Sequence, residues 1–169
     1  IANLRSGLAG ADVLVELSGI AELKELRIDD TGLRIGAGVA LQTIATHPVI
    51  ARDYAALSQA ALSVAGPTHR AVATVGGNLL VDTRCRFFNQ SEVWREANHY
   101  CLKQGGGTCR AAPKASRCYA AFSGDLAPAL IVHDAVAEIL GPNGRREVAL
   151  AALYQDEGRG FSLLGAHEI

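Results

Sequence analysis

The sequence predicts an α+β fold in which a mixed, mostly antiparallel sheet carries helices on one side. Two turn sequences predict the antiparallel strands: Asp30-Thr31-Gly32 and Pro142-Asn143-Gly144 each lie between short apolar runs that suit the strands of a hairpin. A third observation predicts the helices, because apolar residues recur three and four positions apart between Leu41 and Val64.

The strands follow from these turns and from other short apolar runs. Gly36–Gly38 lets the backbone leave the first hairpin, and the two glycines of Ala73–Leu80 predict a strand–glycine–strand passage. The remaining expected strands are short, and Asp12–Leu17 is expected to be buried; they are Asp12–Leu17, Glu25–Ile28, Leu33–Ile35, Val136–Leu140 and Glu147–Leu150.

The helices are bounded by proline, glycine and aspartate. Pro48 can open a new helix inside the Leu41–Val64 stretch, and Gly66-Pro67 ends that stretch. A short helix is expected over Ala127–Val132, opened by Asp125 and Pro128, and one more helical turn over Leu150–Tyr154. Thr83–Ser123 shows little periodicity and is expected to be mostly loop.

Length and composition restrict the function classes. A chain of 169 residues with 49% hydrophobic residues is one large or two small domains with a real core. A net charge of −1 argues against a nucleic-acid or membrane surface, and no apolar run approaches the roughly 20 residues of a membrane span. No secretory signal is visible, which favours a cytoplasmic protein. The absence of methionine suggests a piece of a longer product.

Four cysteines are the main anomaly. They follow the spacing C-x15-C-x7-C-x8-C at Cys85, Cys101, Cys109 and Cys118. Reduced thiols grouped in this way favour metal or redox chemistry over disulfides. The spacing lacks the tight C-x2–4-C pair of structural zinc sites, whereas iron–sulfur clusters tolerate varied spacing. Disulfides and four inert thiols remain alternatives.

The segment from Arg84 to Cys118 is strongly basic. It has seven basic and two acidic residues, a net charge of 7 − 2 = +5 in a chain that totals −1. Nearby cations lower thiol pKa values and stabilise a negatively charged cluster. The segment therefore agrees with a cubane iron–sulfur cluster; its charged residues are Arg84, Arg86, Glu92, Arg95, Glu96, Lys103, Arg110, Lys114 and Arg117.

Two further segments are candidate ligand sites. In Thr74-Val75-Gly76-Gly77-Asn78, the glycines would let a phosphate or ring approach the main chain, whose N–H groups can form an anion-binding nest, although a bulge or tight turn is the commoner role of such a pair. Asp125 can bind a ligand hydroxyl or ring N–H, or can simply cap the helix that follows. The five histidines fit no metal spacing.

Three segments together resemble one protein family. LRIGAGVALQTIATHPVI, SVAGPTHRAVATVGGNLLVDTRC and SGDLAPAL, in this order, are similar to the flavin-binding subunits of the xanthine dehydrogenase and carbon monoxide dehydrogenase family. The resemblance implies an FAD-binding (PCMH-like) domain, whose N-terminal phosphate-loop subdomain and C-terminal subdomain are expected outside the sequence. It places FAD against Val64, Ala65, Gly66, Thr74, Val75, Gly76, Gly77, Asn78 and Asp125.

The cysteine segment resembles one branch of that family. CRFFNQSEVWREANHYCLK, Cys109 and CYAAFSGDLAPAL are similar to the flavin subunits of 4-hydroxybenzoyl-CoA reductases, which implies a 4Fe–4S insert over 84–118 with the four cysteines as ligands. Because Asn78 and Cys85 are seven residues apart, Arg86 is hypothesised to bridge flavin and cluster.

The resemblance also implies an activity and partners. The chain is expected to be an electron-transfer subunit with no catalytic residue of its own, in a dimer of heterotrimers with a molybdenum-cofactor large subunit and a 2Fe–2S small subunit. The implied reaction is reductive dehydroxylation of 4-hydroxybenzoyl-CoA to benzoyl-CoA, with ferredoxin as donor. A related molybdenum hydroxylase acting on another aromatic or heterocyclic substrate and a zinc-binding interaction module are the alternatives.

Overall fold

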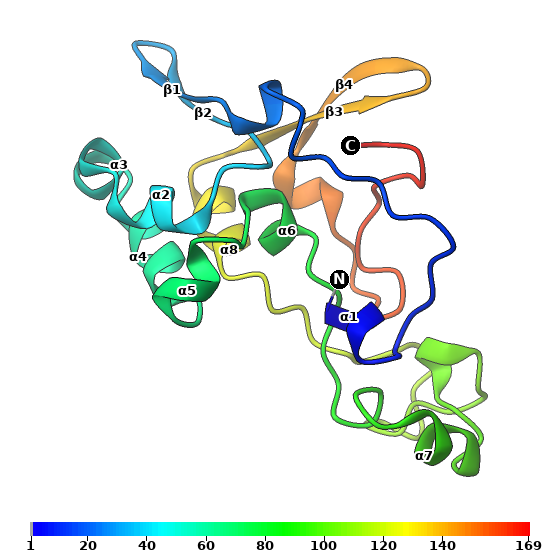
Figure 1. The fold of residues 1–169 in the computed structure, drawn as a ribbon. Coiled ribbons are helices and arrows are strands. Elements are labelled where there is room, and N and C mark those ends of the chain that lie inside the picture. The colour runs from blue at the N-terminus through cyan, green and yellow to red at the C-terminus, as the bar shows by residue number, and fades with distance from the viewer. Residues whose placement is uncertain (1) are drawn as a thin grey trace. The chain divides into compact units, whose positions relative to one another are not determined.

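The structure is a computed structural model that describes residues 2–169, with the backbone alone at Ala2. Short helices and two hairpins make up its regular elements (Figure 1). In chain order they are α1 Ala2–Arg5, the 3-10 helix η1 Glu22–Lys24, β1 Leu26–Asp29, β2 Gly32–Ile35, α2 Leu41–Thr46, α3 Pro48–Asp53, α4 Ala55–Ser63, α5 Pro67–Arg70, α6 Val75–Leu79, α7 Glu92–Ala97, η2 Leu102–Gln104, α8 Leu126–Val132, β3 Val136–Gly141, β4 Gly144–Ala149 and η3 Leu150–Leu153.

The chain divides into two compact units. The cysteine unit combines the N-terminal segment up to Val15 with Asp82–Ser123 and Tyr154–Leu163. The hairpin unit combines Glu16–Val81, Gly124–Leu153 and Leu164–Ile169. All four cysteines and Arg86 belong to the cysteine unit, whereas the other residues expected to contact FAD belong to the hairpin unit.

Both predicted hairpins are confirmed. In β1–β2, Leu26 lies opposite Ile35, and in β3–β4, Val136 lies opposite Ala149. Glycine is needed at both turns, because the φ angle is +125° at Gly32 and +95° at Gly144.

The expected mixed sheet is wrong, since the described residues form two separate two-stranded sheets. One reason is visible at the edge of β3, where Leu140 exchanges backbone hydrogen bonds of 2.8 and 2.9 Å with Ile169. The two hairpins meet through side chains instead: Arg34 donates to Glu138 at 3.1 Å.

The helical stretch from Leu41 to Val64 is confirmed as α2, α3 and α4, which group together in Figure 1. α3 begins at Pro48, and α4 ends before Gly66, as expected. Their apolar faces and the start of α8 form the core of the hairpin unit, because burying these side chains removes apolar surface from water. The fully buried core side chains are Leu41, Ile44, Ile50, Leu57, Ala61 and Leu126.

One local expectation is wrong and one is confirmed. Asp12–Leu17 is no strand: no described strand pairs with it, and Val13 and Val15 are each 76% exposed. An apolar run becomes a strand only when a partner takes its N–H and C=O groups. Thr83–Ser123 is mostly loop, as expected, and contains the short helices α7 and η2; Ser91 caps α7 by accepting the N–H of Trp94 at 3.3 Å.

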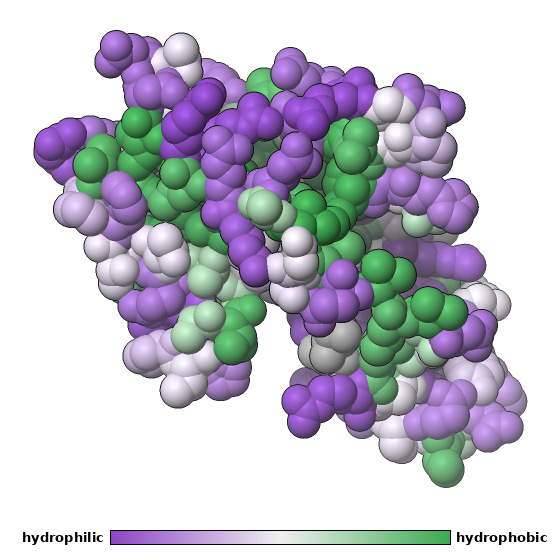
Figure 2. Space-filling view, turned by 45° about the horizontal axis from the view of Figure 1, so that its top comes forward, coloured by the Kyte–Doolittle hydropathy of each residue, from purple (hydrophilic) through white to green (hydrophobic). Residues whose placement is uncertain are grey.

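Apolar side chains also remain visible between polar ones on the face drawn in Figure 2. Across residues 2–169, the helices are too short or too polar for a membrane crossing.

Candidate cofactor sites

The Ala73–Leu80 passage is a short helix and not the predicted strand–glycine–strand. Thr74 begins α6 by accepting the N–H of Gly77 on its hydroxyl at 3.1 Å, so the chain turns where an extended strand was expected. Val75 is buried and lies one helical turn from Leu79, which packs against the same core. One isolated bridge, between Ala40 and Thr74, keeps the extended pairing.

The glycines of this passage serve close packing. The Gly76 N–H donates to the carbonyl of Ala37 at 2.8 Å, and a Cβ on Gly76 would come within 2.8 Å of the Ala37 Cβ. The Val75 N–H donates to Val39 at 3.0 Å. The GAGV motif (36–39) and the TVGGN motif (74–78) therefore pack together. Every N–H from Val75 to Asn78 has an acceptor within the chain. The expected anion nest is not formed by these groups.

Asn78 connects α6 to the start of α8. Its side-chain oxygen accepts the N–H of Leu126 at 2.9 Å, and its side-chain nitrogen donates to the Asp125 carboxylate at 3.3 Å. Asp125 precedes α8 but makes no side-chain capping bond to it, and it is exposed. Helix capping is therefore not its role, and the carboxylate keeps acceptor capacity for a ligand.

The turn over Val64–Gly66 is held by a residue that sequence reasoning missed. Arg70 is 9% exposed, and its Nη1 donates to the carbonyls of Leu62, Val64 and Ala65 at 3.0, 3.0 and 2.9 Å. Ala65 has a φ angle of +41°, a strained left-handed conformation for a residue with a Cβ. Nothing in the local spacing predicts that one arginine would bind three carbonyls.

A cavity of about 730 Å3 opens in the hairpin unit. Its size lies within the roughly 300–1,000 Å3 of small-molecule sites. Both hairpins and the ends of α6 and α8 line it, and it includes Val75 and Gly76 from the predicted FAD contacts. The others do not line this cavity: they are Val64, Ala65, Gly66, Thr74, Gly77, Asn78 and Asp125.

All four cysteines line one small cavity in the cysteine unit. Cys101, Cys109 and Cys118 are buried, Cys85 is half-buried, and none forms a disulfide. The remaining walls are mainly apolar or basic: Phe87, Phe88, Leu102, Lys103, Arg110 and Ala120. The structure thus brings together residues separated by up to 33 positions (118 − 85) in a loop without long helices.

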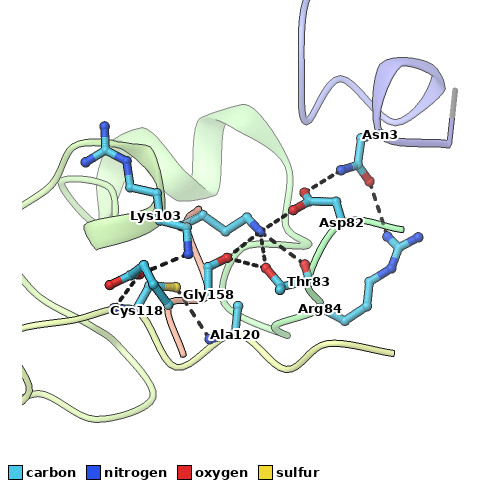
Figure 3. A network of polar contacts seen from close by, with 10 residues as sticks. Asn3, Asp82, Thr83, Arg84, Lys103, Cys118, Ala120 and Gly158 are labelled. Carbon is cyan, nitrogen blue, oxygen red and sulfur yellow. Dashed lines mark hydrogen bonds and ion pairs between the residues drawn. The ribbon is translucent and has the colours of Figure 1, made fainter. Parts of the chain in front are cut away.

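Lys103 holds the walls of this cavity in place (Figure 3). Its ammonium donates to the Asp82 carboxylate at 2.6 Å, to the Gly158 carbonyl at 3.1 Å and to both oxygens of Thr83. The Lys103 side chain is only 6% exposed, so its charge is paired out of water. Gly158 in turn donates its N–H to the carbonyl of Cys118 at 3.0 Å. The ammonium thereby ties three segments of the cysteine unit.

The pKa values of Cys109 and Cys118 shift in opposite directions. Burial raises the pKa of Cys109, but backbone N–H groups of Tyr119, Ala112 and Ala111 outweigh it and lower the pKa overall. At Cys118 burial prevails and raises the pKa, although the Ala120 N–H donates to its sulfur at 3.4 Å. Cys109 is therefore the thiol better prepared to act as a thiolate.

The structure assigns the cations of the loop different places. Arg86, the hypothesised bridge, is exposed and does not line the cavity of the cysteines. Lys103 and Arg110 do, although they were only counted in the basic charge of the loop. Adjacency to a cysteine does not distinguish them, because Arg86 directly follows Cys85 and Arg117 directly precedes Cys118, and neither lines the cavity.

The four thiols are not arranged as the ligands of a single ion. Among residues 2–169, no three His, Cys, Asp or Glu side chains converge as the ligands of one ion do. A 4Fe–4S cluster makes a different demand, because each of its four irons takes one thiolate and the sulfurs stay further apart. Four free thiols line one cavity. The cavity itself is about 10 Å3, room for one water molecule, so a cluster would widen the loop.

Known proteins share this architecture. Residues 1–169 match the family described as "FAD binding domain in molybdopterin dehydrogenase". The aldehyde oxidoreductase FAD-binding subunit PaoB of Escherichia coli K12 is 36% identical over an alignment of 159 positions, which covers 86% of this chain and 48% of that protein. The chain thus spans about half the length of this curated relative.

Two solved structures show the fold. Quinoline 2-oxidoreductase from Pseudomonas putida 86 superposes with a TM-score of 0.68 at 20% identity, over 99% of this chain and 45% of the other. Carbon monoxide dehydrogenase from Oligotropha carboxidovorans superposes with a TM-score of 0.57 at 21% identity, over 88% and 38%.

Proposed function

The chain belongs to the family of FAD-binding domains in molybdopterin dehydrogenases, and we propose that it holds a 4Fe–4S cluster in addition to FAD. The single observation that carries the cluster is the cavity lined by all four cysteines. Its basic walls support the proposal, because positive charge favours a negatively charged iron–sulfur centre, and its apolar walls would shield that centre from solvent. Cys85, Cys101, Cys109 and Cys118 would each hold one iron, and 84–118 would form the cluster-binding insert.

The FAD contacts are proposed in the hairpin unit. Val64–Gly66, Thr74–Asn78 and Asp125 would line the groove, with Arg70 shaping the turn at Ala65 and Asn78 fixing the carboxylate of Asp125. The carboxylate of Asp125 would accept a hydrogen bond from a ribityl hydroxyl or ring N–H. Arg86 would stabilise negative charge on the flavin or on the cluster. When bound, both groups supply redox chemistry, and the protein supplies binding, orientation and electrostatics.

The whole protein would be the electron-transfer subunit of a molybdenum enzyme, with a large molybdenum-cofactor subunit and a small 2Fe–2S subunit. The cysteine segment supports the reductive dehydroxylation of 4-hydroxybenzoyl-CoA, with ferredoxin as donor. A second candidate, oxidation of an aldehyde, is favoured by the 36% identity to the E. coli subunit. Since the substrate would bind to the large subunit, no residue of this chain selects between them.

Metal and flavin analysis of the anaerobically purified complex tests the cofactors. We expect one FAD and four irons with four acid-labile sulfides per copy of this chain, beyond the iron of the small subunit. Cys109→Ser should remove the iron of this chain, whereas Thr108→Ala, a matched change at an exposed neighbour, should retain it. Wild-type protein without this iron, or with its thiols paired as disulfides, would refute the cluster.

Activity assays of the same complex decide between the two substrates. Ferredoxin-dependent formation of benzoyl-CoA supports the reductive reaction. Oxidation of aromatic aldehydes without benzoyl-CoA formation supports the second candidate.

A further inference from the structure

We propose that Arg110 is a positioning residue for the cluster: its Nε–H donates a hydrogen bond to a sulfur atom of the 4Fe–4S centre and raises the reduction potential of that centre. The inference rests on the proposed cluster. It concerns one side chain on the wall of the cysteine cavity, and no part of the FAD site enters it.

The guanidinium of Arg110 is buried in part without a partner. Arg110 directly follows Cys109 and lines the same cavity as the four sulfurs. Its Nε is shielded from solvent and has no acceptor among the described residues. Buried N–H donors almost always have acceptors, so an orphaned donor of a cation beside four thiols calls for an acceptor at that place.

The other unpaired buried atoms do not share this position. Arg95 also has an orphaned Nε, but it lies outside the cavity and its other nitrogens are bound to backbone carbonyls and to Glu92. Gln104 has an orphaned oxygen, which is an acceptor and also lies outside the cavity. Of these three residues, Arg110 is the one that lines the cavity of the four cysteines.

The second cation of the cavity is already committed. The Lys103 ammonium has three donors, and it is shared among Asp82, Thr83 and Gly158. It would therefore act on the cluster through its charge alone, whereas the Arg110 Nε–H is available for a direct bond. Of the cations among the residues that line the cavity, Arg110 is the one with a free donor.

The effect on potential has a fixed sign. Reduction adds one negative charge to the cluster, and a charge-assisted hydrogen bond strengthens as its acceptor becomes more negative. The bond therefore stabilises the reduced form more than the oxidised form, and its removal lowers the potential.

Redox titration of the anaerobic complex, followed by electron paramagnetic resonance, tests the inference. Arg110→Gln removes the charge and the donor, and Arg110→Lys keeps the charge but removes the Nε–H. Both should retain iron and shift the midpoint potential downward, Gln by about 59 mV, which is a tenfold change for one electron. Lys114→Gln removes an equal charge from an exposed site of the same loop and should shift it far less.

A wild-type measurement covers the case in which a variant loses its cluster. In wild-type protein labelled with 15N-arginine, pulsed electron paramagnetic resonance of the reduced cluster should show a coupled nitrogen. An Arg110→Lys variant that retains its iron should lack this coupling. Unchanged potentials in both Arg110 variants, or no coupled nitrogen in wild type, would overturn the role of Arg110 while leaving the cluster in place. Wild type without iron would overturn the proposed function instead.

Discussion

Asn78 donates a side-chain hydrogen bond to the carboxylate of Asp125, 47 positions further along the chain, at 3.3 Å. The same amide accepts the N–H of Leu126 at 2.9 Å, so one side chain joins α6 to α8. The TVGGN and SGDLAP motifs, which look independent in the sequence, therefore meet in the hairpin unit. Four predictions follow from this and related contacts.

Replacing Asn78 with alanine should weaken both the fold and FAD binding. The change breaks two hydrogen bonds and is expected to cost about 1–3 kcal/mol, because the Leu126 N–H loses its acceptor. It also frees the Asp125 carboxylate, so FAD affinity should fall. Denaturant unfolding and flavin titration of the complex measure the two effects. Gln59→Ala removes an exposed amide from α4 and serves as control; equal FAD affinity in both variants would contradict the role of Asn78.

Replacing Gly76 with alanine should destabilise the protein by about 1–3 kcal/mol, the usual cost of overpacking. The new methyl would meet the Ala37 Cβ at 2.8 Å and the Ala37 carbonyl oxygen at 3.1 Å. Thermal unfolding gives the comparison with Gly19→Ala, whose added methyl meets nothing within 4 Å. A Gly76 variant as stable as the Gly19 variant would show that the 36–39 loop shifts to admit the methyl group at no cost in stability.

Replacing Lys103 with methionine should loosen the cysteine cavity. It leaves Asp82 without its cation, and we expect a loss of about 2 kcal/mol, below the roughly 3–5 kcal/mol for a fully buried pair because the Asp82 side chain is 35% exposed. Iron should therefore leave faster in the presence of a chelator. Lys114→Met is the control on the same loop. Identical rates of iron loss in the Lys103 and Lys114 variants would show that Lys103 does not stabilise the cysteine cavity.

Deprotonation of Tyr154 should lower the free energy of unfolding at alkaline pH. Burial raises the pKa of this phenol to about 12 in the folded protein, from about 10 in the unfolded chain. The folded state thus binds the proton more tightly, so this contribution is complete below pH 10 and is lost as pH rises toward 12. Tyr154→Phe should flatten the melting temperature between pH 10 and 12. The same slope in wild type and variant would assign it to other groups.

Local chemistry determined the hairpins and the long helical stretch. The turn sequences at Asp30-Thr31-Gly32 and Pro142-Asn143-Gly144 require positive φ at glycine, and that requirement acts within four residues of chain. Leu41 and Ile44 lie three positions apart on one face of α2, and Leu57 lies on the buried face of α4. Such spacing predicts a helix whatever element packs against that face. These elements were predicted correctly because their cause is near them in the sequence.

Tertiary contacts decided the rest. Ala73–Leu80 became a helix because its N–H groups find acceptors on Thr74 and on the Ala37–Val39 loop, whereas Asp12–Leu17 found no partner strand among the described residues. The sequence shows the composition of the cysteine loop, and the spacing and the family resemblance together predict its four thiols as cluster ligands. That they share one cavity, with Lys103 tied to Asp82 and Arg110 left with a free donor, depends on where distant segments meet, because hydrogen bonds and burial are fixed by position in space.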